Sequence, residues 1–574
     1  MMRPLPAHST TEQNPPNAAA KRAAHPLFVP MWAAPSLQPQ LPFLFPVDPN
    51  LPPSPKRHYR SQYRYLGPQD LLDKARRNTL SDFEIALRLI DFTPLERMLA
   101  ACYYVPSAKG QVPFHPVSMF LAICLRREQH LSWAELATLL AGENGAGWRR
   151  CFGFAEGDTP SASGLRYFFH SVGPAVFDAL CPRFIALLRQ HGRCPQHSTY
   201  PGDPEDRGVS VSQDGMLHPA RSRACCQQAT DSCFQPVRAQ SDSPAEGGAV
   251  ERGRPCRARE KGLPGCACDT PACQEQCQRA SKLDPKARFI HYEGHNHKSS
   301  PHCSGDGGKD KHGATQASGR GESKGVDVFG YRSLAQRILD DRFAASWNAQ
   351  SKLYAANTDE RSVFVAGLQN LTMHPLDLSI GELLGDSAVG YEPCLNAIFA
   401  LGALRMVDIR ADKGDLDDAV CLRRGYDGEG HPLCDHGYRM RSNGHDYARQ
   451  VTKYVCAQLC RREPRREGEA VVPVEGCPYL DEEHPLGAVT NVGRTMPDGT
   501  VRLARDIPYG SPVWKARYGR RNRSESRNSE IEGLGLKRMC DYGLARNTKE
   551  VQLADFVINL RTLGRLVREA SDLA

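Results

Sequence analysis

A short arginine-rich stretch near the C-terminus has the residue types needed to act on phosphate groups. The sequence YGRRNRSESRNSE spans residues 518–530, and Glu525 lies in its middle. Between Lys515 and Arg527, Glu525 is the one acidic residue among six basic residues. Such a concentration of positive charge is typical of surfaces that contact nucleic-acid phosphates. Glu525 is therefore either the partner of a buried ion pair or a metal ligand held against a nucleic-acid backbone.

Two other acids are predicted at the carboxyl ends of strands. The segment VSVSQDGMLH (209–218) suits a strand that ends at Asp214, and LSIGELLGD (378–386) suits one that ends at Asp386. Ligands collect at this edge of open α/β sheets. With Glu525 on a helix near the sheet, three carboxylates would supply the hard oxygen ligands that Mg²⁺ or Mn²⁺ prefers. Two such ions about 4 Å apart can activate an attacking oxygen and stabilise the leaving one in phosphodiester cleavage.

Each of these acids also has an ordinary structural interpretation. An Asp after a strand is usually a turn residue or a helix cap. A Glu among arginines is usually a surface ion pair that contributes little stability. Composition and spacing alone do not select these three from the 65 acidic residues of the chain.

The same residues carry a resemblance to a known family. Tyr518, Arg521 and Glu525 reproduce the Y-x2-R-x3-E signature of bacterial insertion-sequence DDE transposases, and Asn528 and Ser529 stand where that family often has the pair NS. Upstream, SQDGMLHPARSR resembles the segment of the first catalytic aspartate, and ELLGDSAVGYEPCLNAI resembles that of the second. The likeness extends over most of residues 80–574.

The resemblance implies an RNase H-like catalytic core in which Asp214, Asp386 and Glu525 bind Mg²⁺ or Mn²⁺. It also implies that residues of the signature segment contact transposon-end DNA. The extended signature has a Lys seven positions after the Glu, whereas this chain has Glu532 there, and Lys537 is the candidate to replace it. The implied DNA contacts are Tyr518 and Arg521, with Arg520, Arg523, Asn528 and Ser529 as neighbours.

Two groups of cysteines have spacings compatible with structural Zn²⁺. The alternative interpretation of each group is a set of unpaired thiols in mobile loops, and the spacing leaves both open. The candidate ligands are Cys266, Cys268, Cys273 and Cys277 in the first group, and Cys434, His436, Cys456, Cys460 and Cys477 in the second.

The elements that position these residues fall into three predicted regions. Residues 1–65 are expected to be a disordered leader, because residues 1–56 hold 14 of the 43 prolines. Residues 66–200 show short helical patterns with basic ends, which suit a helix-turn-helix-like DNA-binding domain or an ordinary helical bundle. Strand and helix patterns alternate in residues 205–574, with insertions at about 219–325 and 415–510.

We therefore expect an α/β fold, with an RNase H-like catalytic core that contains large cysteine-containing insertions. An all-helical N-terminal domain would precede it. The chain is expected to close with a helix whose apolar face is formed by Leu553, Phe556, Leu560, Leu563 and Val567.

Composition gives limited information about the partner and location of the chain. Its net charge of +8 indicates a polyanionic partner only weakly. No apolar run approaches the roughly 20 residues that cross a bilayer, and the N-terminus lacks a secretory pattern. A cytoplasmic, nucleoid-associated location is expected. The 21 cysteines are then expected to be metal ligands or buried thiols rather than disulfides.

Three functions are compatible with these features. The first is a transposase that binds the terminal inverted repeats of its own mobile element as double-stranded DNA. It would cleave and join strands with metal ions, as a homodimer on DNA because two ends must be brought together. The second is a non-catalytic DNA-binding protein derived from a transposase. The third is a stand-alone metal-dependent nuclease.

Overall fold

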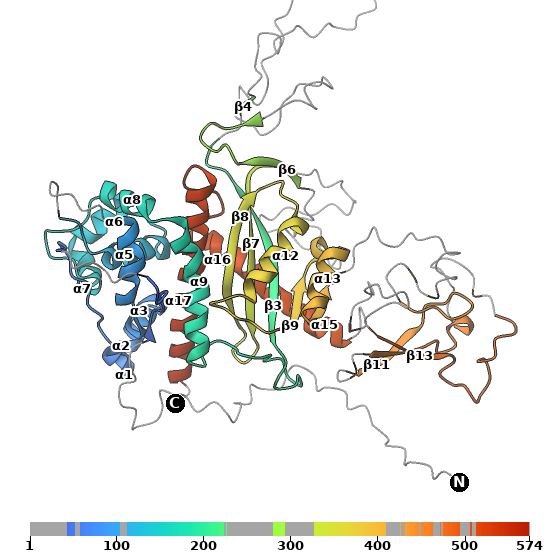
Figure 1. Ribbon diagram of the computed structural model, residues 1–574. Coiled ribbons are helices and arrows are strands. Elements are labelled where there is room, and N and C mark those ends of the chain that lie inside the picture. Colours follow the sequence, from blue (N-terminus) through green and yellow to red (C-terminus); the bar gives the residue numbers. More distant parts are fainter. Residues whose placement is uncertain are drawn as a thin grey trace, which may run out of the picture.

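The computed structural model of the protein describes a mixed α/β molecule (Figure 1). The first cysteine group, Cys266 to Cys277, and the first part of the predicted leader, residues 1–42, lie outside the described residues. The described residues are 43–51, 58–103, 112–222, 225–226, 279–292, 326–408, 425, 427, 431–446, 449, 451–462, 471, 474–493, 506–507 and 512–572.

The N-terminal part is helical, as its sequence predicts. Ser132 caps its helix as half of a capping box with Glu135, and Ser81 and Glu84 form a second capping box. These reciprocal bonds satisfy backbone N–H groups that the first helical turn leaves unpaired. The helices are α1 (Gln69–Leu72), α2 (Lys74–Thr79), α3 (Asp82–Leu89), α4 (Glu96–Tyr103), α5 (Pro116–Glu128), α6 (Trp133–Ala141), α7 (Ala146–Phe152), α8 (Ala162–Ser171) and α9 (Pro174–Gln190).

The C-terminal helix α17 (Leu544–Asp572) joins this helical part to the sheet (Figure 1). Phe556 at its centre packs against Phe120 of α5 and Phe184 of α9, with ring centroids 6.0 and 5.5 Å away. On its other side, Asn559 donates a hydrogen bond to the backbone oxygen of Asn348, which lies in the sheet. The five apolar residues predicted to face the interior are all buried, and so is Ile558 beside them.

One hydrophobic core therefore serves both parts of the chain. Helical residues such as Phe120 and sheet residues such as Val211 and Trp347 belong to the same buried cluster. The predicted division into a helical domain before residue 200 and a catalytic domain after 205 therefore does not correspond to two separate hydrophobic cores. A helix hydrophobic around much of its circumference needs partners on both sides, and α17 has them.

Part of the predicted leader forms structure. Strand β1 (Phe43–Leu44) pairs in parallel with β2 (Ile90–Asp91), and Phe45 is fully buried against Phe92 and Phe556. A proline-rich composition predicts disorder only where the segment cannot bury apolar surface. Here Phe45 buries its ring in the core. Residues 43–45 therefore belong to the folded part of the chain rather than to a disordered leader.

The central sheet mixes parallel and antiparallel strands. Its order is β10-β9-β3-β7-β6, with β8 paired to β7 off this path. Strands β3, β9 and β10 are parallel neighbours, whereas β7 runs antiparallel to β3, β6 and β8. The α/β fold expected from the sequence is confirmed. The strands are β3 (Val209–Pro219), β6 (Arg288–Tyr292), β7 (Val326–Asp340), β8 (Ala345–Ala355), β9 (Ile380–Gly385) and β10 (Leu404–Val407).

Helices cover both faces of this sheet. On one face, α12 (Glu360–Leu371) accepts a hydrogen bond at the Gly367 oxygen from Gln350 of β8, and α13 (Glu392–Ala400) packs beside α12 (Figure 1). On the opposite face lie α15 (Pro512–Tyr518) and α16 (Asn522–Gly533), where Arg337 of β7 donates to the Arg523 oxygen. Neighbouring strand residues point to opposite faces, so the two helix layers contact different residues of each strand.

Both predicted insertions contain strands, where mostly irregular structure was expected. Strand β6 lies within the first insertion and joins the central sheet, and β4 (Cys225–Cys226) pairs with β5 (Arg279–Ala280). In the second insertion, β11 (Arg441–Asp446), β12 (Val451–Val455) and β13 (Val489–Val492) form a separate antiparallel sheet. Such short strands are hard to recognise from sequence. Apolar and polar residues alternate clearly along a strand only where one of its faces is buried.

Among the described helices, no single one is long and apolar enough to cross a membrane, and one bent pair, α8 with α9, meets the length and composition test together. Among the described cysteines of the helices and the central sheet region, Cys124, Cys181, Cys194 and Cys394 are buried free thiols.

A buried ion pair network ties α5 to α17. Arg126 and Arg127 both donate to the carboxylate of Glu550, and all three side chains are buried. Burial alone would raise the pKa of Glu550, but the two guanidinium groups lower it from 4.5 to about 2. Between these pH values the unfolded chain takes up a proton at this position and the folded protein does not. The stability that the charge contributes is therefore present above about pH 4.5 and lost as the pH falls toward 2.

We expect Glu550→Gln to lower the free energy of unfolding by about 3–5 kcal/mol at neutral pH, because it leaves two buried guanidinium groups without a counter-charge. The deficit relative to the wild-type protein should shrink as the pH is lowered through the range below 4.5. Urea unfolding followed by circular dichroism at several pH values measures both effects.

Glu569→Gln is the matched control, since Glu569 lies on the same helix but is exposed beside Arg565. It should stay within about 0.5 kcal/mol of wild type. A Glu550→Gln deficit that is equal at neutral and acidic pH would contradict the role assigned to this charge.

Candidate active site

The pairing register of two parallel strands brings Asp214 and Asp386 together. Ser212 of β3 is the partner of Leu384 of β9, so each aspartate follows its paired residue by two positions. Beyond this point β9 ends, and Asp386 caps the short 3-10 helix η6 (Ser387–Val389) by accepting a bond from the Ala388 N–H at 2.9 Å. Strand β3 instead continues to Pro219, so the expectation that it ends at Asp214 is wrong. Its antiparallel partner β7 keeps it extended, with Asp214 opposite Ala335.

Helix α16 carries the third acid to the same place. Ser210, Ser212 and Asp214 share the face of β3 that this helix covers, as the alternation of strand side chains requires. The Ser524 hydroxyl donates to that of Ser212 at 2.5 Å, and two such small side chains allow a close approach of helix and strand. One turn along, the Asn528 amide donates to the Asp214 carboxylate at 2.9 Å.

Arg521 is the common partner of the three acids. Its guanidinium lies 3.9 Å from the Asp214 carboxylate, 4.0 Å from that of Asp386 and 3.3 Å from that of Glu525. Glu525 is four residues after Arg521, a spacing that places both on one side of a helix. Three acids from distant parts of the sequence thus gather around one positive charge.

The gathered carboxylates influence one another. Burial raises the pKa of Asp214, and the negative charges of Asp386 and Glu525 raise it further, while Arg521 opposes the shift. The Asp214 side chain is 12% exposed, whereas those of Asp386 and Glu525 are 43% and 45% exposed. The cluster therefore has a closed side at Asp214 and an open side at the other two acids, from which a substrate can approach.

Glu360 is a fourth carboxylate in this neighbourhood, and the sequence analysis did not single it out. It lies in the first turn of α12, is paired with Arg332, and is close enough to Gly215 that a Cβ there would be 3.4 Å from its oxygen. Burial raises the pKa of Glu360, and the charges of Asp386 and Asp214 add to the effect. The one sequence feature that marks it is its place after Asp359, the N-cap of α12.

Tyr518 lies at the edge of the site. Its ring stacks on Trp514 with centroids 4.4 Å apart, and its hydroxyl reaches the Asp408 carboxylate at 3.5 Å. Its ring also packs against a small buried cluster that includes Leu384. Tyr518 thus helps to hold the signature segment, residues 518–525, against the sheet.

Arg520 faces the interior rather than the open side of the site. It is buried and pairs with Glu382 of β9 and with Asp341, the latter at 2.8 Å. Arg517 pairs with the same Glu382 at 3.3 Å. The predicted DNA contact of Arg520 stays a prediction, and as arranged its guanidinium is paired with these two carboxylates. Arg520 and Arg521 are consecutive residues of the 3-10 helix η9 (Gly519–Arg521), which has three residues per turn, so their side chains point in different directions.

The other predicted contact residues have different surroundings. Arg523 is partly exposed and lies 2.9 Å from Asp341, while Ser529 is exposed on α16. Asn528 is engaged with Asp214, as described above. Lys537, the candidate replacement for the signature lysine, is exposed and pairs at 3.2 Å with Glu532, the residue that stands in the lysine position.

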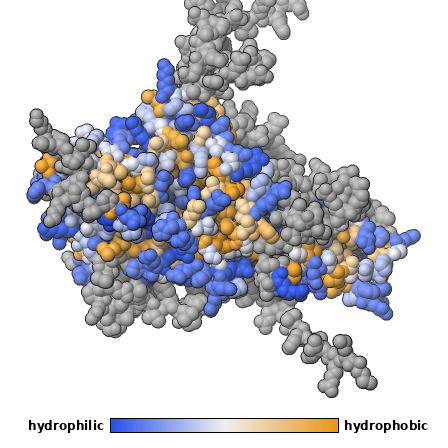
Figure 2. Space-filling model, in the orientation of Figure 1, coloured by the Kyte–Doolittle hydropathy of each residue, from blue (hydrophilic) through white to orange (hydrophobic). Residues whose placement is uncertain are grey.

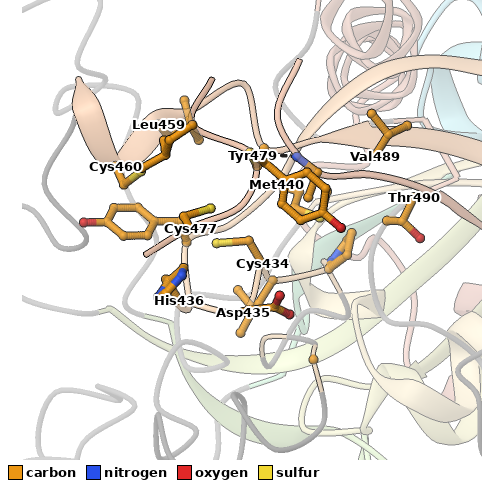
Figure 3. Close-up of a pocket in the computed structure, with 17 residues that line it drawn as sticks. Cys434, Asp435, His436, Met440, Leu459, Cys460, Cys477, Tyr479, Val489 and Thr490 are labelled. Atoms are coloured by element: carbon orange, nitrogen blue, oxygen red, sulfur yellow. Dashed lines mark hydrogen bonds between the residues drawn. The ribbon is translucent and has the colours of Figure 1, made fainter. Parts of the chain in front are cut away.

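The second cysteine group also converges. Cys434, His436, Cys456, Cys460 and Cys477 all line one pocket beside the β11–β13 sheet, with a volume of about 310 Å³ (Figure 3). As the side chains stand, no three His, Cys, Asp or Glu residues in the described part of the chain are arranged to hold a metal ion.

At the acidic site, the guanidinium of Arg521 lies among the three carboxylates. The all-oxygen donor set gathered around a cation nevertheless fits the preference of Mg²⁺.

Comparison of the chain with protein-family models, with curated proteins and with solved structures finds no match.

Because Arg520 neutralises a buried carboxylate, Arg520→Ala should lower the free energy of unfolding by about 3–5 kcal/mol in the absence of any DNA. Lys515→Ala, an exposed position in the same basic segment, should change it by less than about 0.5 kcal/mol. Chemical denaturation of the three proteins measures the difference. Equal stability of the two variants would show that Arg520 does not hold the segment on the sheet.

Proposed function

We propose that this protein is a DNA transposase of the DDE class, whose central sheet is an RNase H-like core. The observation that carries the proposal is the gathering of Asp214, Asp386 and Glu525 within 4.0 Å of the Arg521 guanidinium. Ordinary turn acids or surface ion pairs would have no reason to meet from three separate elements.

The arrangement of the strands supports the same proposal. Three antiparallel strands, β3, β7 and β8, are extended on the other side of β3 by the parallel strands β9 and β10. The first acid lies on the central strand of this set and the second directly after its parallel neighbour. The third comes from a helix that packs on the face of β3 carrying Asp214.

In this proposal Asp214, Asp386 and Glu525 are the ligands of Mg²⁺ or Mn²⁺. When bound, such ions supply an activated attacking oxygen and stabilisation of the leaving oxygen at phosphorus. The chain's own contribution is positional. Asn528 orients the Asp214 carboxylate, and the Ser212–Ser524 contact fixes α16 at the depth that brings Glu525 beside the sheet.

Arg521 has two roles in the proposal. It holds three mutually repelling carboxylates together before substrate binds, and its planar guanidinium matches the oxygens of a DNA phosphate. The open side of the site, where Asp386 and Glu525 are exposed, is where the DNA backbone would lie. Arg523, Ser529 and Lys515 are on or near the same segment and would contact neighbouring phosphates, with Tyr518 at the edge.

The partner we propose is double-stranded DNA, both as transposon ends and as target. Since two ends must be cut and joined together, a homodimer on DNA follows from the reaction itself. A stand-alone nuclease would use the same acidic site, and strand joining distinguishes the two. A non-catalytic DNA-binding protein would not need all three carboxylates in one place.

Glu525→Gln keeps the size of the side chain and removes one charged ligand. We expect it to reduce strand cleavage by more than the roughly 10–100-fold that changes around a metal site usually cost, while affinity for DNA stays within about twofold, since phosphate binding depends on the basic residues. Labelled duplexes taken from the DNA flanking the coding sequence serve as substrates, with Mg²⁺ present.

Glu532→Gln is the matched control, because Glu532 lies on the same helix and is exposed beside Lys537. It should cleave as the wild type does. Wild-type cleavage by Glu525→Gln would refute the proposal, and nicking without any joined product would favour the nuclease.

A further inference from the structure

The pocket of the second insertion brings together four cysteines from three separate segments. Cys434 precedes β11, Cys456 and Cys460 follow β12, and Cys477 comes from the connection to β13. Figure 3 shows Cys434 and Cys477 turned toward each other in this view, with Cys460 and His436 drawn beside them. These thiols have no part in the proposed active site.

The sheet beside this pocket has a very small apolar core. Its buried residues are Met440, Tyr454, Cys456 and Val492, and Cys434 and Ala488 pack against them. Figure 2 shows apolar residues on the surface of this part, where Leu486 and Val489 are 41% and 49% exposed. Units of this size rarely bury enough apolar surface to hold their fold, and most use a disulfide or a metal ion in addition.

Backbone groups are already arranged around the thiols. Cys434 opens a tight turn in which the Gly437 N–H donates to the Cys434 oxygen at 2.8 Å. The sulfur of Cys456 accepts N–H groups of Gln458 at 3.4 Å and of Ala488 at 3.2 Å. A Cβ at Gly487 would lie 1.9 Å from the same sulfur, so this position admits only glycine. Such N–H groups around a sulfur are the kind of surrounding hydrogen bonds that orient ligands in metal sites.

The thiols also influence one another electrostatically. Burial raises the pKa of Cys434, and negative charge at Cys456 and Cys460 raises it further. Burial likewise raises the pKa of Cys460, with added effects from Cys477 and Cys456. The four thiols therefore lie near enough to act on one another.

We propose that Cys434, Cys456, Cys460 and Cys477 bind one structural Zn²⁺ ion as four thiolates. Each thiol loses its proton to solvent as its sulfur binds. Four sulfur ligands suit the tetrahedral preference of zinc. The thiols do not form a closed ligand set as they stand, so side-chain rotation about Cα–Cβ bonds must bring the sulfurs closer together around the ion. The pocket, of about 310 Å³, leaves room for that rotation. His436 lines the pocket but stays outside the ligand set.

The ion would hold the three-strand unit together rather than perform chemistry. This unit is attached to the central sheet by Asp506, whose carboxylate accepts the Arg405 backbone N–H at 2.7 Å and whose backbone oxygen accepts the Thr452 hydroxyl at 3.4 Å. A unit kept in shape by zinc would present a defined surface beside the core. The inference depends on the cysteines alone and stands whether or not the chain is a transposase.

Metal analysis of the full-length protein tests the inference. The double variant Cys460→Ser with Cys477→Ser should contain one zinc ion per chain fewer than the wild type. The control Cys102→Ser, at an exposed thiol on α4, should contain as much as the wild type. Zinc bound by Cys266 to Cys277 would be present in all three proteins and cancels in the difference. Equal zinc in the double variant and the wild type would overturn the proposal, as would iron with labile sulfide in place of zinc.

Two further measurements guard against a variant that simply fails to fold. In the wild-type protein, Co²⁺ substituted for zinc should give sulfur-to-metal charge-transfer absorption, and a chelator should speed protease cleavage within residues 431–493. His436→Ala should keep its zinc. Loss of the ion in His436→Ala together with its retention in Cys456→Ser would overturn the four-thiolate assignment.

Discussion

The candidate site depends on one buried charge, the carboxylate of Glu382 in the centre of β9. A buried carboxylate is costly unless it is paired and fully hydrogen-bonded. Here Ser210 of β3 donates to it at 2.7 Å, and Arg517 and Arg520 bind it from the signature segment. These two arginines therefore hold residues 517–525 against the sheet at Glu382. Arg521 and Glu525 of the same segment are then directed at the carboxyl ends of β3 and β9.

As a consequence, the arginines of this segment have different partners. Arg517 and Arg520 neutralise an acid inside the protein, and Arg521 faces the three acids at the open site. A concentration of positive charge that looks uniform in the sequence is thus partly structural and partly exposed to ligands. The same reasoning applies to Arg527, which is fully buried and binds Asp555 of α17 through two bonds of 2.7 and 2.8 Å.

Helix α17 couples the helical N-terminal part to the site through these buried polar pairs. It binds α16 through Asp555, β8 through Asn559, and α5 through Glu550. Since buried pairs fix orientation as well as contact, the helical part is placed relative to the acidic site by the same helix that completes the core. The helical part also contacts the end of α16 directly, because Arg127 of α5 donates to the backbone oxygen of Leu534, the C-cap of α16, at 2.9 Å.

Local periodicity determined most of the elements by itself. The strand patterns at residues 326–338 and 344–357, the helix pattern at 359–371 and the apolar face of the last helix all correspond to β7, β8, α12 and α17. These elements depend on side-chain period within a single segment, which the sequence carries in full. The choice of Asp214, Asp386 and Glu525 came instead from the resemblance to a known family, and the structure brings these three residues together.

Only the tertiary structure decided the features that depend on long-range pairing. The register of β3 against β9 aligns the two aspartates, and β7 extends β3 past Asp214. The buried Glu382 determines which arginine faces inward, and the return of α12 brings Glu360 near the acids. The convergence of four cysteines depends on the pairing of β11 to β13. These outcomes follow from contacts between segments far apart in the chain, which no local pattern encodes.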